Sequence, residues 1–440
     1  MRALAFALAL LALAPAARAD EPAPPARGID VAAELYNLFL FRNDSDFDRT
    51  PPTYDENGQT VGVFATVFSP TITWRIERGL RIVYQAELGL NYWSKQNPDE
   101  QDATAPDVFV LKHRQIYGEI ERGRLSARVG YARFIDPTGL FLNHWIGVAD
   151  VGWALAGDQR IGVFLGQLPD STYEGLDAAD NNFARDITVA GVRGRVAHPH
   201  FFLDAMLTGL LDRHVVARGR WLVAPSVSVA YAFSGGDLRL DAVAQLGRLG
   251  GTAVDGGDQT LLAYAAQGSL RFGCRDGVEL VVNALAESPD DAVAGNGRSY
   301  AFFSSGKSRS STIMLTEDET RDWYDNLDER MATFDGGFHV NRAGLLVADA
   351  RLTFAVSPTV HLAGVLGGAT VLLPSNALDH TLVGVEADAI ADLDLSAHSS
   401  LRLVIGGLLP GAAGAALVNH ISRTATDPIF MTEAALVLSY

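Results

Sequence analysis

The chain has 440 residues, 48% of them hydrophobic, and it carries 52 acidic against 35 basic side chains, a net charge of −17. So acidic a chain is a poor partner for nucleic acid, whose phosphates attract basic surfaces. The lone Cys274 excludes a disulfide within the chain. The sequence lacks the motifs G-x-S-x-G, H-E-x-x-H and C-x-x-C-H, so we expect no enzyme, no cofactor and no bound metal.

The first 19 residues, MRALAFALALLALAPAARA, have the three parts of a secretory signal peptide. Arg2 begins it, an apolar run follows, and Ala17-Arg18-Ala19 supplies an A-x-A cleavage site. The apolar run is shorter than the ~20 residues that a spanning helix needs. We therefore expect residues 1–19 to be cleaved from an exported protein and residues 20–28, rich in Pro and Ala, to form a flexible leader.

Almost every segment after Ile29 alternates between apolar and polar residues. Leu80–Tyr92 places Leu, Ile, Tyr and Ala on one face and Arg, Gln, Glu and Asn on the other, and residues 237–246 and 260–272 repeat the pattern. A period of two predicts β-strands with one apolar face. Their length of about ten residues is that of a tilted strand that crosses a membrane.

The connections between these segments alternate in length. Tight turns are expected near residues 78–79, 121–123, 156–158, 197–199, 234–237, 274–277, 357–358 and 396–399. Longer polar loops lie between them, and short turns alternating with long loops are typical of outer-membrane barrels. The sequence predicts an all-β fold over residues 29–440: a transmembrane antiparallel up-and-down β-barrel of about 18 strands (16–18), with periplasmic turns and outer loops. A soluble secreted sandwich or propeller is the alternative, but no blade-length repeat appears.

The chain ends on an alternating strand, EAALVLSY. In a bilayer an open sheet edge would leave backbone groups unpaired, so this strand is expected to close the barrel against the first one, near Val31–Phe41. The ending resembles the C-terminal aromatic strand that the barrel-assembly machinery recognises, with Leu438 and Tyr440 as the assembly signal. The expected location is therefore the outer membrane of a Gram-negative bacterium, with its lipid and that machinery as partners.

If the apolar faces meet lipid, the opposite faces line an aqueous channel. The candidates for pore-lining residues are Arg81, Glu87, Arg124, Arg128, Arg239, Asp241, Arg271, Arg351, Glu386, Asp388 and Arg402. Arginine forks suit carboxylates and sugar hydroxyls, which favours a ladder that hands an acidic or hydroxylated chain along the wall. The alternative is a wet wall whose charges pair between neighbouring strands.

The longest loop, Ser288–Asn341, departs from the strand pattern. Thr316 to Glu319 form a capping box, and apolar side chains follow at helical spacing. We expect an outer loop that gates the mouth, and a solvated surface helix is the alternative. The candidates for gating residues are Glu317, Glu319, Trp323, Tyr324 and Asp325.

Two stretches carry a resemblance to a known family. Phe109–Phe141 (FVLKHRQIYGEIERGRLSARVGYARFIDPTGLF) is similar to an aromatic strand, tight turn and glycine-arginine strand end of the alginate export family of outer-membrane barrels. Leu382–Gly414 looks like that family's late hairpin, with Gly384, Glu386, Asp388, Pro410 and Gly411 at its motif positions.

The resemblance implies an outer-membrane channel that exports a polysaccharide, an exopolysaccharide or alginate-like polymer, from the periplasm to the exterior. Its partners would be the polysaccharide and periplasmic export components. Two other functions stay open for the same fold. One is a general or substrate-specific diffusion porin, and the other is a barrel sheath around an electron-transfer protein.

Overall fold

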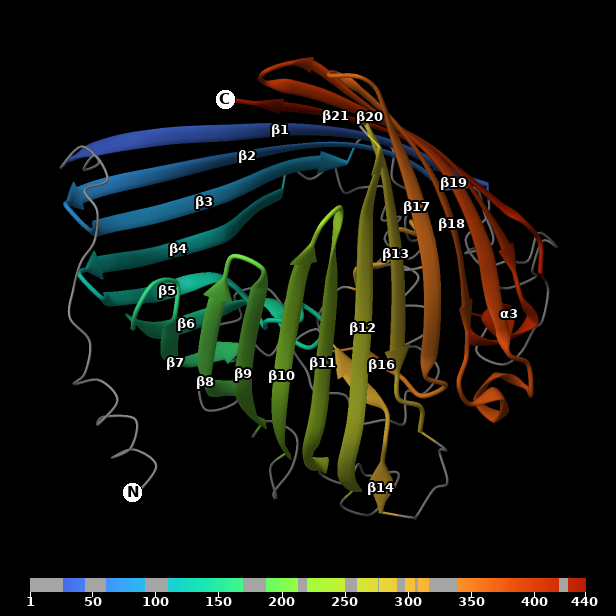
Figure 1. Ribbon diagram of the computed structural model, residues 1–440, viewed down its shortest axis with the longest axis horizontal. Coiled ribbons are helices and arrows are strands. Elements are labelled where there is room, and N and C mark those ends of the chain that lie inside the picture. The colour runs from blue at the N-terminus through green and yellow to red at the C-terminus, as the bar shows by residue number, and fades with distance from the viewer. Residues whose placement is uncertain are drawn as a thin grey trace, which may run out of the picture.

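The computed structural model describes residues 27–43, 61–91, 110–168, 187–212, 220–249, 259–275, 277–290, 297–304, 308–315, 339–418 and 426–440. The residues predicted to form the signal peptide and the leader therefore lie almost wholly outside the described residues. Within them the fold is a closed antiparallel barrel of 18 strands, as the alternating sequence predicts. Each of the 18 barrel strands pairs with the barrel strand that follows it along the chain, which gives the up-and-down order (Figure 1).

The first half of the barrel consists of β1 (Gly28–Arg42), β2 (Val61–Glu77), β3 (Leu80–Asn91), β4 (Val110–Arg122), β5 (Leu125–Ile135), β6 (Asn143–Ala154), β7 (Arg160–Leu168), β8 (Ile187–His198) and β9 (Phe201–Asp212). The second half consists of β10 (Arg220–Phe233), β11 (Gly236–Leu249), β12 (Gln259–Arg275), β13 (Val278–Glu287), β17 (Leu345–Ser357), β18 (Val360–Thr370), β19 (Leu382–Ser396), β20 (Ser399–Pro410) and β21 (Ile429–Ser439).

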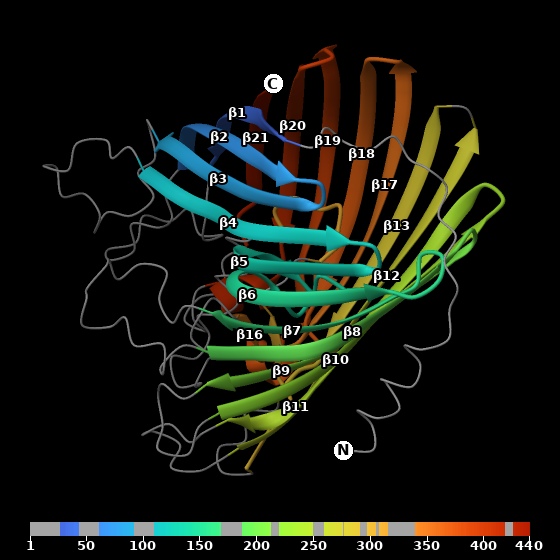
Figure 2. The same ribbon diagram turned by 90° about the vertical axis from the view of Figure 1, so that its left-hand side faces the viewer.

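The barrel closes where β1 meets β21, and the two strands lie side by side in Figures 1 and 2. Their register sets Leu35 opposite Leu438, and the backbones of Ala33 and Tyr440 exchange two hydrogen bonds of 3.0 and 2.9 Å. Closure leaves no open sheet edge, which is the condition for a sheet in hydrocarbon.

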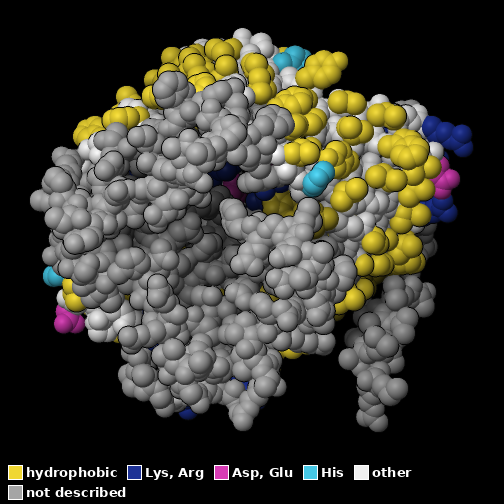
Figure 3. Space-filling model, turned by 180° about the vertical axis from the view of Figure 1, so that it is seen from behind, with side chains coloured by type: hydrophobic (Ala, Val, Ile, Leu, Met, Phe, Trp, Pro, Cys, Tyr) yellow, Lys and Arg dark blue, Asp and Glu magenta, His cyan; other side chains and the backbone are white. Residues whose placement is uncertain are grey.

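The two faces of each strand differ. On β6, Val151 is exposed outward, while Ile146, Val148 and Asp150 are buried on the inward face. The even-numbered residues of β3 continue the outward row of Phe68 and its neighbours on β2, as the sequence predicts. Apolar side chains therefore gather on the outer wall, where they are yellow along the upper and right-hand sides of Figure 3.

The short turns gather at one end of the barrel, here named the turn rim, and the longer connections leave from the opposite end, the loop rim. The short strands β14 (Arg298–Ser299), β15 (Phe302–Ser304) and β16 (His339–Asn341), the 3₁₀ helix η3 (Pro374–Ala377) and the helix α3 (Ala412–Val418) belong to connections of the loop rim. β14 runs parallel to the start of β12, and β15 pairs with β16. No helix among the described residues is long and apolar enough to cross a membrane.

The apolar core lies inside the barrel. Segments of the loop-rim connections turn inward, and their side chains, among them Phe141, Phe303, Leu315 and Leu417, are buried with the inward residues of the strands. The barrel is thus filled in part by its own connections, and what they leave open decides what can pass.

Candidate channel constriction

Two inward segments narrow the barrel. The first inner segment, residues 136–142, joins β5 to β6 and is organised by one carboxylate. Asp136 Oδ1 accepts the backbone N–H groups of Phe141 and Leu142 at 3.1 and 2.9 Å, and its Oδ2 accepts the N–H and hydroxyl of Thr138. Burial raises the pKa of Asp136, and these hydrogen bonds oppose the shift. The carboxylate therefore replaces water for backbone groups that point into the barrel.

The first inner segment is fixed to the far wall by its carbonyl groups. Arg239 on β11 donates to the carbonyl of Pro137 at 3.0 Å, and Gln267 on β12 donates to that of Thr138 at 3.0 Å. The segment therefore crosses the lumen from β5 and β6 to β11 and β12.

The second inner segment, residues 308–315, runs along β12 to β19. Its Arg309 N–H donates to the side chain of Gln267 at 3.0 Å, next to the first inner segment. Further on, Asp349 on β17 accepts the Ser311 N–H at 3.0 Å and the Ser310 hydroxyl at 2.8 Å. Wall carboxylates thus take up the backbone donors of the segment.

Glu386 on β19 holds the end of the second inner segment. Its Oε1 accepts the N–H groups of Ile313 and Met314 at 2.5 and 2.9 Å, and its Oε2 accepts that of Leu315 at 2.7 Å. The three successive donors form a concave site for an anion, and here the anion is a side chain of the wall itself.

Arginines and aspartates form ion pairs on the inward faces of β5, β6, β8 and β11, and one of these pairs includes the second inner segment. Asp150 on β6 pairs with Arg193 on β8 at 2.7 Å and with Arg128 on β5 at 3.7 Å. The side chain of Asp150 is only 5% exposed, whereas those of Arg128 and Arg193 are 26% and 40% exposed. The Asp150 carboxylate is therefore buried, whereas the two arginine side chains that pair with it are partly exposed.

Asp241 on β11 repeats this arrangement. It pairs with Arg239 at 3.3 Å and with Arg309 of the second inner segment at 2.9 Å. Asp241 is 1% exposed and the two arginines 31% and 30%. Burial lowers the pKa of Arg309, and the nearby Arg239 adds to the effect while Asp241 opposes it. We name Arg128, Arg193, Arg239 and Arg309 the arginine belt.

Most of the sequence-predicted pore residues lie on inward faces. By strand alternation this holds for Arg81, Glu87, Arg128, Arg239, Asp241, Arg271, Arg351, Glu386, Asp388 and Arg402. Arg124 differs, because it follows Gly123 in the turn between β4 and β5, where the positive φ of the glycine reverses the chain. Whether these residues line a working pore stays a prediction.

The structure brings only some of these residues together. Arg239 and Asp241 meet in the arginine belt, and Arg351 and Arg402 both face Asp392, at 3.5 and 3.8 Å. Other pairs stand apart near the turn rim: Arg81 binds Glu119 at 2.9 Å, and Arg271 lies near Asp237 and Glu279 at 3.9 and 3.8 Å.

Sequence reasoning missed Asp136, Asp150, Arg193, Arg309 and Asp349. The run Asp136-Pro137-Thr138-Gly139 is a turn signal that could have been recognised, because Asp and Pro favour such turns. The predicted gating residues Glu317, Glu319, Trp323, Tyr324 and Asp325 lie outside the described residues. The described part of the chain holds no group of three or more His, Cys, Asp or Glu side chains suited to a metal ion.

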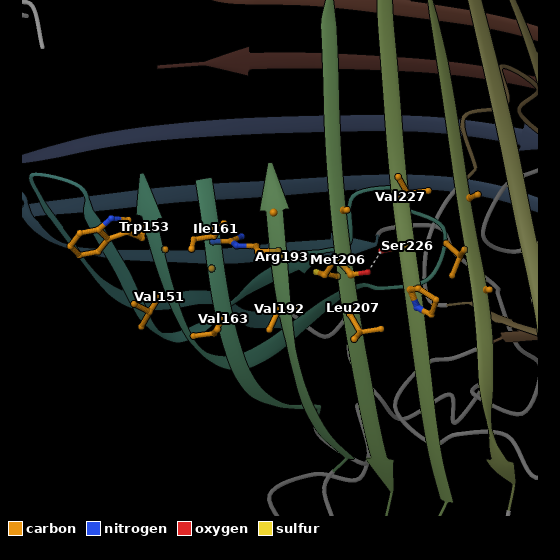
Figure 4. Close-up of a pocket in the computed structure, with 18 of the residues that line it drawn as sticks. Val151, Trp153, Ile161, Val163, Val192, Arg193, Met206, Leu207, Ser226 and Val227 are labelled. Carbon is orange, nitrogen blue, oxygen red and sulfur yellow. Dashed lines mark hydrogen bonds between the residues drawn. The ribbon is translucent and has the colours of Figure 1, made fainter. Parts of the chain in front are cut away.

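A separate hollow of about 1300 Å³ lies on the outer wall over β5 to β12 (Figure 4). Outward side chains such as Val151, Val163, Val192 and Leu207 line it, and its surface is almost wholly apolar. Of the arginine belt only Arg193 borders this hollow, and the outward side chains that line it lie across the sheet from the two inner segments.

The fold and the constriction define the class of protein to which this chain is similar: a closed 18-stranded barrel narrowed from inside, as in porins.

No family model and no curated protein matches the sequence. Solved structures, by contrast, match the fold over nearly the whole chain. Pseudomonas aeruginosa OccK9 (OpdG) has a TM-score of 0.57 at 12% identity, with 93% of this chain and 98% of that chain covered. P. aeruginosa OccK2 (OpdF), in complex with glucuronate, scores 0.54 at 12% identity (94% and 97%). The outer membrane protein OprD from P. aeruginosa scores 0.54 at 11% identity (95% and 96%).

These matches overturn the assignment to the alginate export family and, with it, polysaccharide export as the function. The glycines at the motif positions of residues 382–414 have a physical cause that does not depend on a polysaccharide. A Cβ on Gly411 would lie 2.0 Å from the carbonyl oxygen of Leu382, and one on Gly384 would lie 2.9 Å from Leu408. Close packing of a barrel hairpin demands these glycines whatever the cargo, and Glu386 is engaged by the second inner segment.

Proposed function

We propose that the protein is a diffusion porin of the outer membrane that favours small anionic solutes, carboxylates in particular. One observation carries the proposal: in the arginine belt the side chains of the paired aspartates are 1–5% exposed, whereas those of the four arginines are 26–40% exposed. The water-filled side of the constriction therefore presents positive charge, although the chain as a whole is acidic.

Physical chemistry links that surface to selectivity. A narrow passage with low-dielectric walls focuses the field of the charges that line it, and this raises the local concentration of ions of opposite sign. Guanidinium groups also match the geometry of a carboxylate. The glucuronate bound to OccK2, a barrel of similar fold, is a solute of the proposed kind.

We also propose that the protein is located in the outer membrane. Residues 1–19 would direct export and be removed, and the assembled barrel would sit in outer-membrane lipid with its turn rim toward the periplasm. Fractionation of cells followed by N-terminal sequencing of the barrel tests this. A mature chain that begins at Asp20 and cofractionates with the outer membrane agrees with it, and an uncleaved or soluble chain contradicts it.

The selectivity is tested on the purified barrel in planar bilayers and liposomes. We expect the reversal potential in a KCl gradient to show preference for chloride, and glucuronate to enter liposomes faster than glucose, a neutral sugar of similar size. Arg193→Gln should lower the anion-to-cation permeability ratio by roughly twofold or more.

Arg271→Gln is the matched control, because this arginine is 55% exposed but lies near the turn rim, outside the arginine belt. It should change the ratio less than Arg193→Gln does. A wild-type barrel that prefers cations, or that admits glucose as fast as glucuronate, contradicts the proposal.

A further inference from the structure

Asp388 is a buried carboxyl group with no ion-pair partner among the described residues. It lies on the inward face of β19, two residues after Glu386, and is 6% exposed. Both of its oxygens are buried, and neither receives a hydrogen bond from any residue that the structure describes. An isolated carboxylate in such a place is costly, because it has lost its water and gained no donor.

The second inner segment lies directly over this group. A Cβ built on Gly406 of β20 would stand 2.5 Å from Asp388 Oδ1 and 3.2 Å from Cε of Met314. Gly406 thus leaves the space in which the carboxyl group meets the segment that Glu386 holds through three N–H groups. The two acids are neighbours on the same inward face of β19, two residues apart, and both side chains are buried.

The charged groups around Asp388 do not neutralise it. Across β18 and β20 its partners in register are Val365 and Gly406. Arg351 of β17 and Arg402 of β20 instead face Asp392, and His361 of β18 stands level with that same aspartate.

On the inner segment, residues 310–315 carry no ionisable side chain, and Arg309 is engaged by Asp241. Neither η3 nor α3, which pack near β19, contains an ionisable side chain. Among the described residues, Glu386, another acid, is therefore the ionisable group next to Asp388 on its face of β19.

We propose that Asp388 and Glu386 share a proton and form a pH-operated latch that holds the second inner segment in the lumen. When the segment is seated, the protonated carboxyl group of Asp388 donates its hydrogen bond to the Glu386 carboxylate, which keeps its three backbone donors. Loss of the proton to water leaves two anions side by side under a segment of apolar residues. Their repulsion and their need for water then favour release of residues 313–315.

The direction of the effect follows from the proton balance. The seated state holds a proton that the released state gives up, so a rise in pH favours release. Because the released segment no longer narrows the lumen, the conductance rises. Arg309 belongs to the same segment, so release also loosens the arginine belt.

The first test is single-channel recording of the intact barrel from about pH 5 to about pH 10, a range that includes the shifts known for buried acids. The wild type should show a reversible step to higher conductance on the alkaline side. Asp388→Asn, which keeps the shape and cannot ionise, should lose that step. Asp392→Asn, on the same face four residues away, should keep it.

A step that survives in Asp388→Asn, or a wild type without a step, overturns the latch while leaving anion selectivity untouched. Heat-modifiable migration in gels checks that each variant is a folded barrel.

A second readout does not depend on conduction. Met314→Cys, in a chain whose Cys274 is replaced by Ser, is treated with a charged thiol reagent at each pH. The thiol itself reacts faster at high pH, so the rate is divided by the rate in the same protein that also carries Asp388→Asn. A ratio that rises with pH supports the latch, and a constant ratio contradicts it.

Discussion

Asp136 shows how one side chain can fix a connection inside a barrel. Its two oxygens accept three backbone N–H groups and one hydroxyl within residues 138–142, all of them buried. Without the carboxylate these donors would face apolar neighbours such as Phe141, since water is excluded there. The cost of an unsatisfied buried donor is about 1–3 kcal/mol.

Asp136→Ala should therefore lower the free energy of unfolding by about 1–3 kcal/mol or more and make the open-channel current noisier, because the first inner segment is no longer held. Urea unfolding in lipid vesicles and single-channel recording measure the two effects. Asp158→Ala, in an exposed turn of the turn rim, should change stability by no more than about 0.5 kcal/mol. Equal losses in the two variants would show that Asp136 does not organise the segment.

The residues of the constriction were only partly predictable. Strand alternation in the sequence assigns Arg128, Arg239 and Asp241 to the face of their strands that points inward in the structure. It could not show that Arg239 reaches Pro137 across 102 residues, or that Gln267 reaches Thr138 across 129. Such contacts depend on how the closed barrel places distant connections, and no local pattern records that.

At the scale of single elements, β2 offers a direct test of which face meets lipid. Phe68 is exposed outward, and the adjacent Ser69 points inward, opposite Glu34 of β1. An arginine near the midplane of the lipid face costs about 2–4 kcal/mol. An arginine on the inner face remains in water and here would meet a carboxylate.

Phe68→Arg should thus lower the free energy of unfolding by about 2–4 kcal/mol, while Ser69→Arg should be tolerated. Equilibrium refolding into vesicles at increasing urea concentration measures both. Because the two positions are adjacent, they share depth, strand and neighbours. Similar losses at both positions would mean that the register, or the assignment of the lipid face, is wrong.

The strands were the most predictable elements. The stretch expected at residues 80–92 is found as Leu80–Asn91, and the expected turn at residues 78–79 is present. Long alternation over a sheet with one apolar face leaves few other solutions. The short strands β14, β15 and β16 were missed, because two or three residues carry no period and their pairing depends on the barrel around them.

At the scale of the whole molecule, the barrel exists only if its two ends meet. β1 and β21 pair over nine positions, from Glu34 with Ser439 to Arg42 with Met431, and the Ala33–Tyr440 hydrogen bonds extend the ladder. The final residues are exposed outward, and Tyr440 is 89% exposed. Their role is thus in strand pairing and in contact with lipid rather than in a packed core.

Deletion of Leu438–Tyr440 should remove the last rungs of this seam, together with the aromatic end that resembles an assembly signal. The expected result is little heat-modifiable barrel in the outer membrane and degradation in the periplasm, because unpaired backbone groups of β1 are then exposed to hydrocarbon. Immunoblots of fractionated cells measure this. Tyr440→Phe keeps the strand and the aromatic ring and serves as the control, with near-normal abundance expected. Tyr440→Ala keeps the strand and loses the ring, so it separates pairing from recognition. A truncated chain that reaches the outer membrane at normal abundance would show that the seam closes without its last three residues.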